Sequence, residues 1–234
     1  MNLSGKIVVR SALQPAEIEA MFCLMLTFYD DVDRDVFMKD LLDKDTCILL
    51  RNDSNEIVGF STQKMMSFDI DGRMIYGVFS GDTIIHKDYW GSFELYTVFA
   101  RHFFAYAERY DDFYWFLISK GYKTYRMLPI FFNEYYPNRE NATPDPVQSI
   151  MHGYAKRLCP EEYSDGTGVI AYRTVKDKLK KGVADITEKE LRNQDIRFFL
   201  QANPNYAQGD DLVCIARLHL DNLKPRARAL LFGE

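Results

Sequence analysis

The sequence predicts an α+β fold in which helices flank a mixed, mostly antiparallel twisted sheet. Asp71 and Gly72 stand between two runs of alternating apolar and polar residues, which is a strong hairpin signal. The second run continues as an apolar strand that stops near residue 85 in a short turn, and a long segment of helical periodicity follows. Residues 113–118 form a continuous apolar run between charged residues, as in a strand buried on both faces.

Upstream of this hairpin the chain predicts a strand, two helices and a second hairpin. Apolar residues of the first helix recur at steps of three and four, and Pro15 marks its start: Ile18, Met21, Phe22 and Met25. A polar turn at residues 52–56 separates the two strands of the second hairpin. The expected elements are a strand at 6–10, helices at 14–26 and 34–42, and strands at 46–50 and 57–62.

A helix is expected after the turn near residue 90, before the buried strand. Its stripe of side chains at helical spacing comprises Leu95, Val98, Phe99, His102, Phe103 and Tyr106. His102 lies on this apolar stripe, so we expect it to be a hydrogen-bonded core residue. The order of elements up to this point is strand, two helices, three antiparallel strands, helix and buried strand.

The composition changes after Pro137, where turn formers and charges indicate an exposed connection. We therefore divide the chain into a core of residues 1–136 and a C-terminal part, residues 137–234, that completes the sheet with helical insertions. Thr187 and Glu190 form a capping box that predicts a helix through Leu200. The other expected elements are a helix at 147–158 and strands at 169–173 and 212–220.

Composition excludes several classes of function. The chain has 234 residues, 47% of them hydrophobic, and a net charge of −5, so it can bury one sizeable core and offers no broad basic face for nucleic acid. A short basic cluster is interpreted as a solvated surface: Lys176, Lys178, Lys180 and Lys181. The four cysteines are isolated and lack metal-ligand spacing, which predicts reduced thiols, no metal site and a cytoplasmic protein. Neither a secretion signal nor a membrane span is expected.

The turn between the strand and the helix is a candidate anion site. Backbone N–H groups at a helix start, together with the helix dipole, favour a bound phosphate. Gly91 in this turn permits a phosphate to approach the main chain.

Residues 85–95 resemble the acyl-CoA pyrophosphate motif of the GNAT superfamily of N-acyltransferases, in a divergent bacterial branch. Residues 113–126 are similar to a segment of uncharacterised bacterial GNAT-like proteins, and the resemblance covers residues 1–136. Trp90, Phe93 and Leu95 stand where the family has an Arg and two spaced glycines, so only Gly91 remains of the glycine-rich turn. The resemblance implies that acyl-CoA, with an acetyl or longer chain, contacts Ile84, Ile85, Tyr89, Trp90, Gly91, Ser92 and Phe93.

Acyl transfer to an amine needs a base for the ammonium proton and often an acid for the thiolate. Gly81 within an apolar strand predicts a bulge, and in the family such a bulge frees main-chain groups for the donor. Asp82 and His86 are the candidate bases, although Asp82 could instead satisfy backbone N–H groups and His86 could be a surface residue. The resemblance places the acid on the helix after the buried strand, where Tyr122 and Tyr125 are candidates that compete with Tyr135 and Tyr136.

Three functions remain open. The first is an N-acyltransferase that moves an acyl group from acyl-CoA to a primary amine of a small molecule or peptide. The second takes a longer acyl chain, from CoA or an acyl carrier protein, to lipidate a peptide or amine, because the many aromatic and Met side chains could line an apolar channel. The third is a non-catalytic acyl-CoA-binding module.

Overall fold

A nine-stranded sheet organises the chain, which is described here by a computed structural model that covers residues 3–173 and 177–233. The strand order is β1 (Ser4–Val9), β3 (Thr46–Arg51), β4 (Ile57–Ile70), β5 (Arg73–Ile85), β6 (Phe113–Ser119), β11 (Asp211–Arg217), β9 (Val169–Ile170) and β8 (Tyr163–Ser164), with β7 (Tyr135–Tyr136) also paired to β11. Among the described residues, β5 and β6 are the one parallel pair. The predicted α+β class is therefore confirmed.

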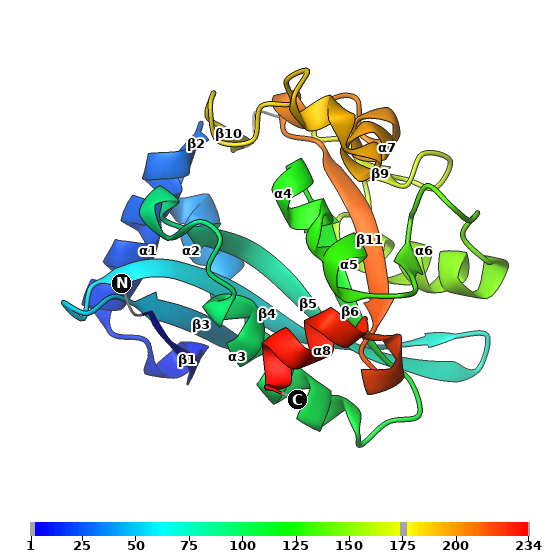
Figure 1. Cartoon of the computed structure of the whole chain (residues 1–234), viewed down its shortest axis with the longest axis horizontal. Helices are drawn as coiled ribbons and strands as arrows, with labels where there is room; N and C mark the ends of the chain where they lie inside the picture. Colours follow the sequence, from blue (N-terminus) through cyan, green and yellow to red (C-terminus); the bar gives the residue numbers. More distant parts are fainter. Residues whose placement is uncertain (1–2, 174–176, 234) are drawn as a thin grey trace.

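Helices cover both faces of the sheet (Figure 1). One face packs against α1 (Pro15–Phe28), α2 (Arg34–Leu42) and α6 (Asp145–Leu158). The other face packs against α3 (Glu94–Ala107), α4 (Tyr122–Tyr125), α5 (Met127–Phe131), α7 (Gln194–Ala202) and α8 (Pro225–Phe232). The core therefore consists of two layers of apolar side chains on opposite sides of β4, β5 and β6.

The hairpin between β4 and β5 turns at the two predicted residues. Asp71 and Gly72 have φ values of 53° and 81°, as a two-residue turn of type I′ requires. The twist of such a turn matches that of its strands, and β4 and β5 are the longest strands described, with 14 and 13 residues.

The bulge predicted at Gly81 is present. Ser61 pairs with Thr83 and Gln63 pairs with Ser80, so Gly81 and Asp82 together oppose the single residue Thr62. A β carbon on Gly81 would lie 2.6 Å from the Thr62 hydroxyl oxygen, so any larger residue would require neighbouring side chains to shift. Pairing of β5 with β6 also ends at Ser80, so no described strand lies beside the rest of β5 on that side.

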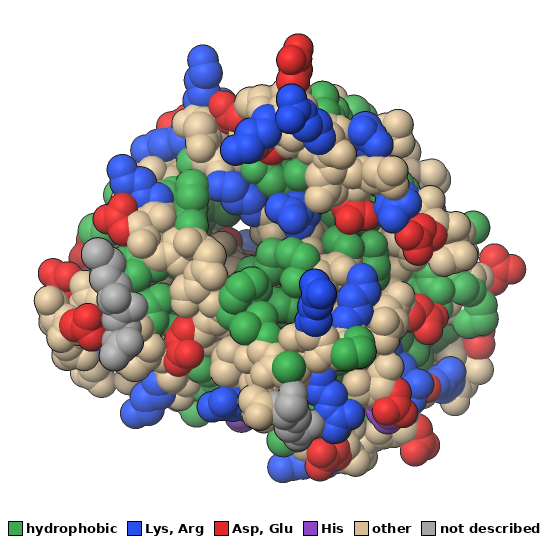
Figure 2. Space-filling view, in the orientation of Figure 1, with side chains coloured by type: hydrophobic (Ala, Val, Ile, Leu, Met, Phe, Trp, Pro, Cys, Tyr) green, Lys and Arg blue, Asp and Glu red, His purple; other side chains and the backbone are tan. Residues whose placement is uncertain are grey.

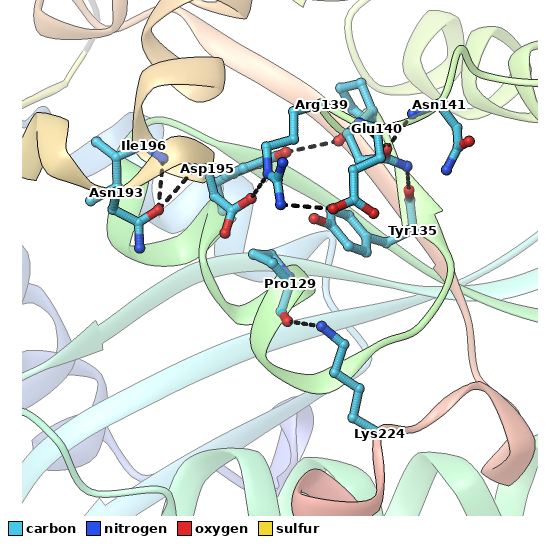
Figure 3. Close-up of polar contacts among 12 residues, drawn as sticks. Pro129, Tyr135, Arg139, Glu140, Asn141, Asn193, Asp195, Ile196 and Lys224 are labelled. Carbon is cyan, nitrogen blue, oxygen red and sulfur yellow. Dashed lines mark hydrogen bonds and ion pairs between the residues drawn. The ribbon is translucent and has the colours of Figure 1, made fainter.

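The C-terminal residues add strands to the same sheet, because β11 lies between β6 and β9. Arg139, in the connection before α6, forms ion pairs with Glu140 and with Asp195 on α7 (Figure 3). Lys224, just before α8, donates to the carbonyl of Pro129 at 2.6 Å, so α8 is tied to α5. These polar contacts hold the last helices against the sheet.

Two sequence predictions are wrong in detail. The Thr187 and Glu190 side chains do contact each other, but α7 begins later, at Gln194, because the Asn193 side chain caps it by accepting from the backbone N–H groups of Asp195 and Ile196. His102 is exposed on α3 and touches only the edge of Phe103, so it is not a core residue. Of the basic cluster, Lys176 lies outside the described residues, and the four cysteines are free.

Candidate functional site

A cavity of about 550 Å³ lies where β5 separates from β6. Its walls come from the ends of α1 and α2, the unpaired half of β5, the turn before α3, the start of α4 and the segment 177–184. That segment includes β10 (Lys178–Leu179), which pairs with β2 (Tyr29–Asp30) and so links the C-terminal part of the chain to the residues after α1. Figure 2 shows Lys and Arg side chains above a hollow in this face and hydrophobic side chains below it.

The unpaired half of β5 presents main-chain groups to this cavity. The backbone N–H of His86 donates to the carbonyl of Val58 on β4 at 2.8 Å. Because hydrogen-bonded and non-hydrogen-bonded pairs alternate in an antiparallel ladder, Ile84 also bonds to β4, whereas the N–H and C=O groups of Thr83 and Ile85 point away from it. The carbonyl of Ile85 accepts from the indole N–H of Trp90 at 2.8 Å, and no described strand pairs with the other groups.

The turn after β5 combines an aromatic ring with a cation. The Lys123 ammonium lies 3.3 Å from the centre of the Trp90 ring, which joins the turn to α4 across the cavity mouth. Gly91 has φ of +96°, in the left-handed region that favours glycine. At the start of α3, the Glu94 carboxylate accepts from the backbone N–H of Gly5 at 2.9 Å, so it is bound to β1.

Asp82 faces the cavity from the bulge. Its side chain makes no hydrogen bond or ion pair within residues 3–173 and 177–233. Burial raises the pKa of Asp82 to about 7, and the charges of Asp40 and Asp177 act in the same direction against the opposing effect of Lys44 and Lys120. A carboxylate with this pKa can accept a proton near neutral pH.

A network of two carboxylates and a lysine stands beside Asp82. The Lys120 ammonium lies 3.0 Å from the Asp177 carboxylate and 3.8 Å from the Asp211 carboxylate. The Tyr172 hydroxyl donates to Asp211 at 2.9 Å. Burial opposes the charge on Lys120, but Asp211 and Asp177 prevail and raise its pKa, so Lys120 stays protonated.

The order of elements and the separation of β5 from β6 after a bulge are the features expected from the resemblance. In these features the fold resembles that of the GNAT acyltransferases. No family model matches the sequence, and no curated protein matches it.

Solved structures with a similar arrangement include a probable N-acyltransferase from Enterococcus faecalis (13% identity, TM-score 0.41, covering 54% of this chain and 32% of that chain). A GNAT family acetyltransferase from Staphylococcus aureus has 12% identity and a TM-score of 0.41, covering 60% of this chain and 89% of that one. The N-acetyltransferase YhbS from Escherichia coli, in complex with CoA, has 12% identity and a TM-score of 0.39, covering 54% and 68%. This chain thus spans about a third of the E. faecalis protein, and likenesses this distant carry no information on substrate.

The fold brings most of the predicted site residues together. The cavity is lined by Asp82, Ile84, Ile85, Trp90, Gly91, Ser92, Phe93 and Tyr122. His86, Tyr89 and Tyr125 lie outside it. His86 packs against Phe28 and Tyr89, while the Tyr125 hydroxyl donates to the carbonyl of Pro137 at 3.0 Å within the core.

The polar cavity residues that the sequence did not reveal include Tyr29, Lys120, Lys123, Asp177 and Asp211. Tyr29 follows α1 as the first residue of β2, and burial raises its pKa well above the usual range, with Asp82 as the next cause. Lys120 is the first charged residue after the buried run 113–118, and this position at the end of a strand was the available signal for it. Asp177 and Asp211 are remote in sequence, and no local pattern joins them.

Within residues 3–173 and 177–233, no set of three or more His, Cys, Asp or Glu side chains is arranged to hold a metal ion. In the same residues, no helix has the length and apolar character to cross a bilayer.

Proposed function

We propose that this protein is an N-acyltransferase that moves an acyl group from acyl-CoA to a primary amine of a small molecule or peptide. One observation carries the proposal: Asp82, Thr83 and Ile85 line the same cavity, on the edge of β5 that no described strand pairs. The main-chain groups of Thr83 and Ile85 offer hydrogen bonds to the amides and thioester of the acyl donor. The Asp82 carboxylate offers a base to the acceptor amine.

Starting from an ammonium group, the acceptor nitrogen loses two protons, one before it attacks and one from the tetrahedral intermediate, and the departing thiolate gains one proton. Asp82 takes the proton from the ammonium group, and the free amine nitrogen then attacks the thioester carbon, so that a C–N bond forms and the C–S bond breaks. A backbone N–H group of β5 donates a hydrogen bond to the thioester oxygen and stabilises the negative charge that develops there.

Tyr122 is our candidate for the acid that protonates the departing thiolate. Its side chain lines the cavity and is 8% exposed. Burial raises its pKa, so the hydroxyl keeps its proton at neutral pH until a strong base such as a thiolate is formed. Tyr29 also lines the cavity and has a raised pKa, which makes it the alternative.

The phosphates of the donor fit the side of the cavity that carries Trp90, Gly91, Lys123 and Arg126. Two cations, the start of α3 and a glycine in the left-handed region all favour an anion there. A longer acyl donor, from CoA or an acyl carrier protein, is a second candidate, because α1 and α2 line the cavity with Met25, Phe28, Val36 and Phe37.

Mass spectrometry of reaction mixtures tests the proposal. The protein is incubated with acetyl-CoA or octanoyl-CoA and a mixture of primary amines, and both N-acylated amine and free CoA are quantified. Formation of both products in equal amounts supports an N-acyltransferase, and the preferred donor reports the chain length. Tight binding of a donor without any N-acyl product would instead indicate a binding module.

A further inference from the structure

The lining of the cavity that we assign to acyl transfer carries more acidic than basic side chains. Its lining includes six aspartates and three cations. Two of the cations, Lys123 and Arg126, belong to α4 and its end, on the donor side. The third cation, Lys120, lies among the acidic residues of the lining, which are Asp31, Asp33, Asp40, Asp82, Asp177 and Asp211.

Four of these aspartates already have partners. Asp40 pairs with Lys44 at 2.6 Å, Asp31 pairs with Lys178 at 2.9 Å, and Lys120 serves both Asp177 and Asp211. Among the described residues, Asp82 and Asp33 have no cationic partner. The carboxylate of Asp33 caps α2 by accepting from the backbone N–H of Val36 at 2.9 Å, which leaves its negative charge unneutralised.

These two carboxylates differ in depth. Asp82 lies inside, at the bulge of β5, whereas Asp33 is exposed at the start of α2. The cavity also carries apolar side chains from α1, α2 and the connection between them, namely Phe28, Val32, Val36 and Phe37. An inner carboxylate, an outer carboxylate and an apolar wall match a molecule with two ammonium groups joined by methylenes.

We propose that the acceptor is an aliphatic diamine or polyamine whose reacting nitrogen lies at Asp82 and whose second ammonium group lies at Asp33. The inference rests on the acyltransferase function proposed above and names its substrate class. The methylenes pack on the apolar wall, and the second ammonium stays charged throughout, so it contributes to binding rather than to the chemical step. Amines with neutral or anionic tails are disfavoured because nothing neutralises Asp33.

The test compares two acceptors of matched length, 1,4-diaminobutane and 4-amino-1-butanol, with acetyl-CoA and octanoyl-CoA as donors. We expect kcat/KM to be at least tenfold higher for the diamine, and the difference to shrink as salt is added. In Asp33→Asn, which keeps the cap because Asn is an equally good capping residue, the preference should fall below about threefold. Asp35→Asn, on the same helix but outside the cavity lining, is the control and should keep the full preference.

Equal kcat/KM for the two amines, or an undiminished preference in Asp33→Asn, would overturn the proposal. Calorimetric titration with each donor separates this failure from that of the function itself. Donor binding with acylation of other amines but not the diamine overturns the acceptor class alone, whereas absence of donor binding overturns both proposals.

Discussion

The two halves of β5 have opposite surroundings. From Tyr76 to Ser80 the strand is paired on both sides, with β4 and β6, and its side chains are mostly buried. From Gly81 onward it keeps β4 but loses β6, and its free edge lines the cavity. A single bulge separates the two halves. The first half of β5 therefore supports the fold, whereas the second half leaves main-chain N–H and C=O groups accessible to a ligand.

Glycine substitutions in the two halves should have the largest effect and separate these roles. A β carbon on Gly77 would lie 2.5 Å from the Tyr114 carbonyl oxygen, whereas one on Gly81 would meet the side chains of Thr62 and Lys44. We expect Gly77→Ala to lower the free energy of unfolding by about 3 kcal/mol or more and Gly81→Ala by roughly 1 kcal/mol, because side chains yield more easily than backbone. Denaturant unfolding measures both, and equal losses would contradict the division of β5.

Asp82→Asn should reduce turnover on the order of a hundredfold, the usual scale of a positioned base. His86→Gln is the matched control, since His86 lies in the same strand–turn segment but outside the cavity lining. Steady-state rates of both variants decide the matter. Loss of activity in the His86 variant alone would place the base in the turn.

The pKa of Asp82 also predicts how rate and stability depend on pH. Because the pKa is about 7 in the folded state, kcat/KM should rise with pH through 7. Stability should move the other way: the folded state holds the proton more tightly than the unfolded chain, so the free energy of unfolding falls as pH rises from about 4 to 7. Denaturation of Asp82→Asn across this range should lack that fall, and an unchanged slope would show that Asp82 does not titrate as proposed.

Gly91→Val should weaken acyl-CoA binding at least tenfold. A β carbon there meets no atom within 4 Å, so the effect comes from the φ of +96°, which forces the turn to rearrange, and from the branches that obstruct a phosphate. Gly72→Val, at φ of +81° with equally open surroundings in a distant hairpin, is the control. Calorimetric affinities that match between the two variants would move the anion site elsewhere.

The smallest expected effect concerns acyl chain length. If the apolar wall of α1 and α2 accepts the acyl group, each added methylene that becomes buried should improve donor affinity by up to ~0.8 kcal/mol. If that wall instead accepts a diamine, affinity should be flat or should decline beyond acetyl. A series of donors from two to ten carbons, titrated against the unmodified protein, separates the two uses of the wall.

Local patterns predicted the parts of this site that lie within one stretch of chain. Asp71 and Gly72 predict a turn because they adopt positive φ values easily. Gly81 predicts the bulge because a glycine inside an apolar strand weakens the strand and often marks a bulge. Lys120, Asp177 and Asp211 could not be predicted, since their contact exists only after β11 is placed beside β6. His102 shows the limit of periodicity, because its position on an apolar stripe did not reveal that the edge of that stripe is exposed.

Amide hydrogen exchange along β5 tests the central claim, that the free edge of this strand binds the acyl donor. We expect acetyl-CoA to slow exchange of the Thr83 and Ile85 amides, which point toward the cavity. The His86 amide, bonded to Val58, should be protected with or without the donor. Unchanged exchange at both Thr83 and Ile85 in the presence of saturating acetyl-CoA would contradict the account.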